Sequence, residues 1–181
     1  MINVYAPNKD TNIINFLNNL LITLRKNNFD EEENIIIGGD FNCPPNPILD
    51  KKGGLLIPRK SVVTTIENLQ EELDLVDIWR VKNPERKSFT WSQNSPMIFC
   101  RLDYWLISNS LHDLVKTTDI IKTDHAAISL ELVKVTVDLQ GCLPKNHSYA
   151  RRLCFNHRKV YIIVKLIKCK IRKNKHFKDL I

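Results

Sequence analysis

Glycine, aromatic residues and long apolar runs are all scarce in this sequence. Its 181 residues include only 5 glycines and 8% aromatic residues, but 43% are hydrophobic. This composition excludes collagen-like, disordered and repeat-built chains and favours one ordinary domain. The apolar stretch Val160–Val164 stops at Lys165, well short of the ~18–20 residues that a membrane span needs. The first residues lack a basic segment followed by an apolar one, so we expect no secretory signal and an intracellular protein.

The cysteines do not have the spacing of a disulfide framework. There are five of them, an odd number, and none forms a C-x-x-C pair. Because disulfide-rich domains carry even numbers of cysteines at short spacings, we expect these to be reduced thiols.

Charge divides the chain into two parts. Residues 1–135 hold 15 Lys and Arg against 18 Asp and Glu, a net charge of −3, whereas residues 136–181 hold 12 against 2, a net charge of +10. We interpret residues 1–135 as a domain and residues 136–181 as a basic tail of a different kind. Such a tail attracts nucleic acid or an anionic membrane through its summed field, or is only a solvated extension.

The first forty residues predict a strand, a helix and a second strand. The segment Ile2–Tyr5 is β-branched or aromatic and stops before a Pro-containing turn, as a strand does. Apolar residues then recur at three- and four-residue steps, which predicts a helix from a cap at Asp10 or Thr11 up to Lys26-Asn27-Asn28. The run Ile35–Ile37 is continuously apolar and is typical of a strand covered on both faces.

A long polar loop and two helical segments follow. The loop Phe41–Pro58 is rich in Pro and Gly, and long loops in compact domains tend to be functional. Thr64 and Glu67 have the spacing of a capping box at the start of a helix. The segment Leu73–Trp79 is predicted to be helical as well.

The remaining strands make the fold α/β. Three segments are predicted as strands: Ser88–Ser92, Phe99–Ile107 and Ala126–Val133. In the second, alternation places Tyr104 on one face and Trp105 on the other. This mixture of strands and helices favours a layered sandwich over a purely parallel sheet.

Polar clusters stand at the ends of these strands, where a rigid sheet holds side chains and a loop leaves them accessible. Asp40 and Asn42 follow the Ile-rich strand, two residues apart on extended chain; they form either a site or an Asx turn. Arg101 and Asp103 lie within an apolar strand, where they act at a site or pair with each other at a sheet edge. Asp124 and His125 adjoin the last strand, and an acid beside an imidazole suits proton transfer or cation binding. Taken singly, these are weak signals.

In order, the motifs form a specific pattern. They are VYAPN (4–8), GGDFN (38–42), FTW (89–91), RLDYWLIS (101–108) and TDHAAISL (123–130). This order resembles the exonuclease-endonuclease-phosphatase family of metal-dependent phosphodiesterases. The stretch from GGDFN to GG (38–54) and DLVDIWR (74–80) look like the endonuclease domain of LINE-type retrotransposons. The resemblance spans Val4 to about Val133 and implies a four-layer α-β-β-α sandwich.

The resemblance also implies roles for individual residues. Asp40 orients or deprotonates the attacking water, and Asn42 holds that water or a phosphate oxygen. Asp124 is a metal ligand with Asp40, and the ion is Mg²⁺, with Mn²⁺ as the alternative. His125 hydrogen-bonds the phosphate, while Asp103 fixes its tautomer from behind.

Three further residues complete the implied site. Tyr5 contacts the phosphate or the leaving oxygen. Thr90 supports the site and contacts substrate, and Arg101 contacts substrate. No small-molecule cofactor is implied.

One departure from the family pattern concerns the start of the sequence. The family has an Asn-bearing strand and a metal-binding Glu upstream of its VYAPN-like segment, which here is residues 4–8. The comparison therefore suggests an N-terminally truncated copy that lacks its first strands and this Glu. Whether such a chain is still an enzyme is left open.

The leading hypothesis is Mg²⁺-dependent nicking of DNA by a LINE-type endonuclease, located in the nucleus by resemblance to its family. The alternative is a catalytically dead remnant that binds nucleic acid through its basic tail. A phosphatase of small phosphoesters or lipids shares the core motifs, but FTW (89–91) and the 38–54 loop favour DNA cleavage.

Overall fold

A computed structural model of the chain describes residues 1–27, 34–55, 59–121 and 127–132. The basic tail, the end of the 41–58 loop, and Asp124 and His125 lie outside these residues. None of the described helices is long and apolar enough to cross a bilayer. The described elements run in the order β1 (Ile2–Tyr5), α1 (Asp10–Lys26), β2 (Ile36–Asp40), β3 (Lys51–Lys52), α2 (Lys60–Glu72), β4 (Leu75–Asp77), α3 (Ile78–Lys82), β5 (Trp91–Asn94), β6 (Met97–Cys100), β7 (Asp103–Ser108), the 3-10 helix η1 (Asn109–Leu114), β8 (Val115–Ile121) and β9 (Ala127–Leu132).

A four-stranded mixed sheet in the order β1-β2-β7-β4 is the centre of the structure. Strand β1 runs parallel to β2, whereas β7 is antiparallel to both β2 and β4. Every residue of β2 is buried, as predicted for a strand covered on both faces.

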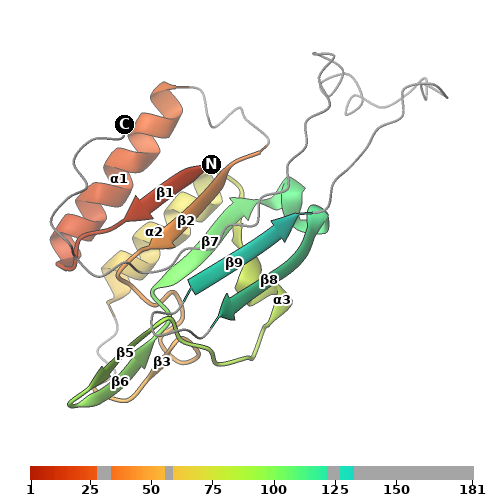
Figure 1. The fold of residues 1–181 in the computed structure, drawn as a ribbon. Coiled ribbons are helices and arrows are strands. Elements are labelled where there is room, and N and C mark those ends of the chain that lie inside the picture. The colour runs from red at the N-terminus through yellow and green to blue at the C-terminus, as the bar shows by residue number, and fades with distance from the viewer. Residues whose placement is uncertain (28–33, 56–58, 122–126, 133–181) are drawn as a thin grey trace, which may run out of the picture.

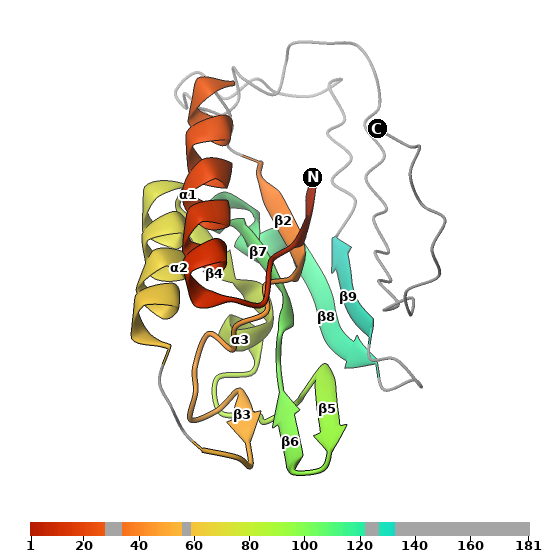
Figure 2. The same ribbon diagram turned by 90° about the vertical axis from the view of Figure 1, so that its left-hand side faces the viewer.

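Figures 1 and 2 show that α1 and α2 lie side by side on one face of this sheet, and that the β8–β9 hairpin covers the other. The first core, between the sheet and the helices, includes Leu17, Ile66, Tyr104 and Leu106. The second core lies towards the hairpin and α3 and includes Trp105. The predicted facing of Tyr104 and Trp105 is therefore confirmed, as is the α/β class, and the described residues form three successive layers.

Gly38 brings β2 and β7 into close contact in the second core. Gly38 is the register partner of Trp105, and a Cβ atom at position 38 would lie only 1.9 Å from the Trp105 ring. Since any larger residue would displace the ring, this part of the sequence motif serves packing.

The helix starts differ from the predicted ones. Neither Asp10 nor Thr11 caps α1, whose cap position is Lys9. Likewise, α2 begins at Lys60, so Thr64 and Glu67 lie inside the helix and do not form a capping box. Arg59, the residue before α2, ion-pairs with Asp10, the first residue of α1, so a tertiary contact joins the two helix starts.

Two predicted elements are divided in the structure. Leu73–Trp79 is not one helical piece, because β4 hydrogen-bonds with β7 and Asp77 then caps α3. Phe99–Ile107 is not one strand, because β6 and β7 belong to different sheets and separate at Arg101 and Leu102. Strand β7 lies between β2 and β4 and is therefore not an edge strand.

Two of the remaining strands, β5 and β9, lie near their predicted positions, whereas β3 and β8 were not predicted. Strand β5 begins at Trp91, three residues after the predicted start at Ser88, and β9 lies within the predicted Ala126–Val133. Sequence reasoning missed β8, the antiparallel partner of β9. A small third sheet, in the order β3-β6-β5, extends from the body (Figure 2).

Candidate active site

Three of the predicted site residues lie in one row across the central sheet. Tyr5 ends β1 and is the register partner of Asp40, which ends β2. Asp40 in turn is opposite Asp103, the first residue of β7. Residues directly opposite each other in a sheet project from the same face, so the ladder brings the phenol and the two carboxylates together.

The turn after β2 is built by Asp40 and Asn42. The Asn42 backbone N–H donates to Asp40 Oδ1 at 2.9 Å, which is the predicted Asx turn. Asn42 has φ of 51°, a left-handed conformation that Asn tolerates better than most residues. Its Nδ2 donates to the Ala6 carbonyl, using one of the two N–H groups of the amide. The turn is therefore tied to the segment that follows β1.

Thr90 and Asp103 are joined through the backbone. The Thr90 hydroxyl accepts from the N–H of Leu102 at 2.9 Å and from the N–H of Asp103 at 3.1 Å. Thr90 is buried, so this geometry supports the position of Asp103. The Leu102 carbonyl accepts from the Phe41 N–H at 2.9 Å, which links the start of β7 to the turn after β2.

Arg101 was predicted to contact substrate, but it is buried in the interior. Its side chain is 0% exposed and forms ion pairs with Asp50, through Nε at 2.7 Å, and with Asp77, through Nη2 at 2.6 Å. Its partner is therefore not Asp103. A guanidinium enclosed between two carboxylates in the interior is not positioned to contact substrate, so the structure replaces that prediction with a structural role.

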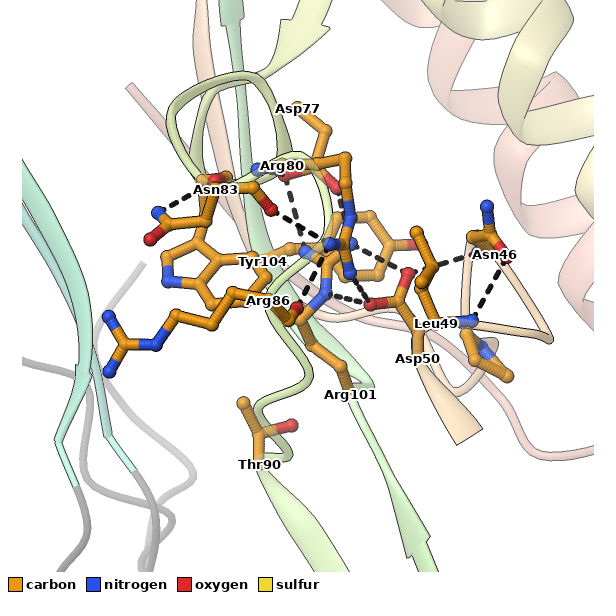
Figure 3. Close-up of polar contacts among 12 residues, drawn as sticks. Asn46, Leu49, Asp50, Asp77, Arg80, Asn83, Arg86, Thr90, Arg101 and Tyr104 are labelled. Atoms are coloured by element: carbon orange, nitrogen blue, oxygen red, sulfur yellow. Dashed lines mark hydrogen bonds and ion pairs between the residues drawn. The ribbon is translucent and has the colours of Figure 1, made fainter. Parts of the chain in front are cut away.

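The buried network around Arg101 extends further (Figure 3). Arg80 also ion-pairs with Asp50, and the Arg101 guanidinium lies over the rings of Trp79 and Tyr104, at 5.1 and 5.2 Å from their centroids. Burial by itself would lower the pKa of Arg101, but hydrogen bonds and charge from the two aspartates raise it above its ordinary value. The network therefore stays charged and anchors the loop after β2 at Asp50.

A pocket of about 780 Å³ adjoins two residues of this row, Tyr5 and Asp40. Tyr5, Asp40 and Asn42 line it, together with the cations Lys51, Arg59 and Lys60 and the ring of Trp91. Tyr5 is 65% exposed and Asp40 only 3%, so the phenol is accessible and the carboxylate lies deeper.

Sequence reasoning missed several residues that shape this region. Arg59 lies in none of the motifs, and Lys51 and Trp91 lie within the 38–54 and FTW (89–91) motifs but were given no role at the site. Asp50 and Asp77 could have been sought, because a charged Arg101 in an apolar strand requires acidic partners.

Cys43, the residue that follows Asn42, is buried and lines the pocket. Burial raises the pKa of the Cys43 thiol to about 11, although the nearby Arg59 guanidinium opposes part of that rise. Burial also raises the pKa of Tyr104 well above its ordinary value, and the Tyr104 ring stacks on Phe41 with centroids 4.2 Å apart. Both groups are therefore neutral at physiological pH.

The carboxylates at the site determine which metal ion would fit there. Asp40 and Asp103 are adjacent across the sheet, and no cluster of three or more His, Cys, Asp or Glu occurs in the described part of the chain. Mg²⁺ retains several waters and needs only one or two carboxylates, unlike structural zinc, which takes four N or S ligands. This donor set therefore fits Mg²⁺ better. The predicted Asp124 and His125 lie outside the described residues.

No family model matches this sequence. The chain is similar to the "Transposon TX1 uncharacterized 149 kDa protein" of Xenopus laevis, with 30% identity over 139 residues. The match covers 73% of this chain but only 10% of the transposon protein, so the chain spans a small part of that relative.

Solved structures with a similar fold are exonucleases and AP endonucleases. An AP endonuclease from Archaeoglobus fulgidus matches with a TM-score of 0.60, and a 3'-5' exonuclease from Neisseria meningitidis with 0.54; each is 17% identical. Both matches cover 72% of this chain and 60% of the other. The chain therefore has the mixed-sheet α/β fold of exonucleases and AP endonucleases.

Proposed function

We propose that this chain hydrolyses phosphodiester bonds in DNA with Mg²⁺, as the endonuclease part of a LINE-type retrotransposon protein. The observation that carries the proposal is the row Tyr5, Asp40 and Asp103 beside a pocket with cationic and aromatic walls. The likeness to a transposon protein and to nuclease structures supports it. Mn²⁺ is the alternative ion.

Asp40 and Asp103 are the described residues that would hold the ion, with Asp124 as a further ligand by resemblance. Two carboxylates opposite each other repel, and a divalent cation between them would offset that repulsion. When bound, Mg²⁺ would polarise the phosphate and neutralise charge developing on it.

The protein groups have separate tasks in this mechanism. Asp40 accepts a proton from the attacking water, and the amide of Asn42, fixed by its bond to Ala6, orients that water or a phosphate oxygen. The exposed phenol of Tyr5 donates to a phosphate oxygen. His125, by resemblance, donates to the phosphate with its tautomer set by Asp103.

DNA is the proposed substrate. Lys51 and Lys60 line the pocket, and cations at a strand-cleaving site neutralise backbone phosphates. One structure with this fold, a 3' phosphatase from Neisseria with a TM-score of 0.53 and 17% identity, is bound to a product DNA hairpin. A nuclear location follows from the proposed substrate.

Nicking of supercoiled plasmid is the test. The purified chain with Mg²⁺ should convert supercoiled plasmid to the open circle, and Asp40→Ala or His125→Ala should abolish the conversion. Asp113→Ala is the matched control, because its carboxylate is 97% exposed, and should leave the rate unchanged. Nicking that persists in both site variants would show a contaminant or another site.

A second candidate is an inactive remnant that binds nucleic acid through residues 136–181, whose net charge of +10 favours it. It predicts no nicking but salt-sensitive DNA binding. Deletion of residues 136–181 should then remove the affinity, and retained affinity would contradict this candidate.

A further inference from the structure

Arg59 lies where three segments of the site meet. Its Nε donates to Asp10 Oδ1 at 2.7 Å, its Nη1 to the Asn42 carbonyl at 2.5 Å, and its Nη2 to the Asn8 carbonyl at 3.0 Å. Asn8 belongs to the loop after β1, Asn42 to the turn after β2, and Arg59 itself precedes α2. One guanidinium therefore joins the loops at the ends of β1 and β2 to the start of α2.

Asn42 is held from three directions. Its backbone N–H donates to Asp40, which ends β2, and its side chain donates to Ala6, which follows β1. Arg59 holds the carbonyl from the helix side. The left-handed conformation of Asn42 is tolerated by Asn, and these three contacts fix the turn in it.

The molecule contains a matched pair of ion pairs between the same two helices. Arg59 pairs with Asp10 next to the starts of α2 and α1, whereas Arg25 pairs with Glu72 near their C-terminal ends. The helices therefore run parallel, with their N-terminal ends towards the site. Each pair joins an arginine to a partly exposed carboxylate, but only the first also has bonds to Asn42 and Asn8.

We propose that Arg59 is a positioning residue: its guanidinium fork fixes Asn42 and the loop after β1 in the arrangement that the reaction requires. It acts through backbone carbonyls and not by attracting the DNA. This inference rests on the proposed function for its catalytic consequence, but the fixed conformation of the turn can be measured without any activity.

Alkylation of Cys43 is the structural measurement. Cys43 is buried and directly follows Asn42, so iodoacetamide should label it faster, by peptide mass mapping, in Arg59→Ala than in the unchanged chain. Electrostatics predicts the reverse, because loss of the nearby cation would raise the pKa of Cys43 further and slow a reaction of the thiolate. Cys100, also buried, and the variant Arg25→Ala are the controls, and labelling should be unchanged in both.

The kinetic measurement uses Arg59→Ala and Arg59→Lys. Misplacement of Asn42 should lower kcat for plasmid nicking by about tenfold or more while KM stays nearly constant. Lysine keeps the charge but not the planar fork, so Arg59→Lys should remain impaired. Full activity in Arg59→Lys would show that charge alone matters and would overturn the inference.

The two measurements separate the inference from the proposed function. Faster labelling of Cys43 in Arg59→Ala, in a chain that never nicks DNA, would support the role of Arg59 and contradict the proposed function. Labelling that is unchanged in Arg59→Ala, or equally fast in Arg25→Ala, would overturn the inference whatever the activity.

Discussion

Arg101 and Asp103 are only two residues apart in the sequence, but they belong to two charged regions of different kinds. Arg101 is enclosed with Asp50 and Asp77 in the interior, so that opposite charges balance. Asp103 instead lies directly opposite Asp40, a residue of like charge that lines the pocket. Balanced buried charge is typical of a structural anchor, whereas adjacent carboxylates indicate a site for a cation. The sign of the neighbouring charge, and not burial, separates the two regions.

The largest effect is expected from removing the structural cation. Arg101→Met would leave Asp77 without its guanidinium and Asp50 with Arg80 as its remaining ion-pair partner, which should lower the free energy of unfolding by about 3–5 kcal/mol. Urea unfolding followed by circular dichroism measures this. Asp103→Asn is the contrast, because it should change stability little while abolishing nicking. Equal losses of stability in the two variants would erase the distinction between the regions.

Thr90 sharpens the comparison because it lies between the two regions. Thr90→Val keeps the shape but removes the acceptor of the Leu102 and Asp103 N–H groups, which should cost about 1–3 kcal/mol and also reduce nicking. Thr65→Val is the matched control, since the Thr65 hydroxyl only donates to the Ser61 carbonyl within α2. If both variants have the same urea midpoint, Thr90 does not hold the start of β7.

The smallest effect concerns alkaline pH. Burial raises the pKa of Cys43 from 9.0 to about 11, so the fold favours the neutral thiol. That contribution to stability is complete below pH 9 and is lost as pH rises towards about 11. Cys43→Ser removes the titrating group, so its urea midpoint should fall less over this range than that of the unchanged chain. Identical pH profiles would contradict the burial of this thiol.

Local sequence patterns predicted those elements whose hydrophobic periodicity is visible within the segment itself. Ile2–Tyr5 was predicted as a strand and is one, and α1 (Asp10–Lys26) lies where the apolar periodicity predicted a helix, although its cap position is Lys9. Strand β4 was not predicted, because it has only three residues and is defined by its pairing with β7, which is remote in sequence. The break at Arg101 and Leu102 was missed for a similar reason, since contacts remote in sequence impose it.

The candidate site was predictable only in part. Strand-end positions and residue type pointed to Asp40, Asn42 and Asp103, and the structure brings these residues together through sheet register and the turn after β2. The same reasoning misassigned Arg101, whose acids are 51 and 24 residues away in the sequence. A sequence shows that a buried charge needs a partner, but not which of its acids the fold will bring.

The placement of tryptophan gives the molecule an intrinsic optical probe. Of its three tryptophans, Trp79 and Trp105 are buried in the second core, while Trp91 lines the pocket and is only partly buried. An aqueous quencher such as iodide therefore reaches Trp91 in preference to the other two. Emission that iodide quenches reports on the pocket, and the remaining blue-shifted emission reports on the packing of the two sheets, so a single fluorescence titration follows binding and folding separately.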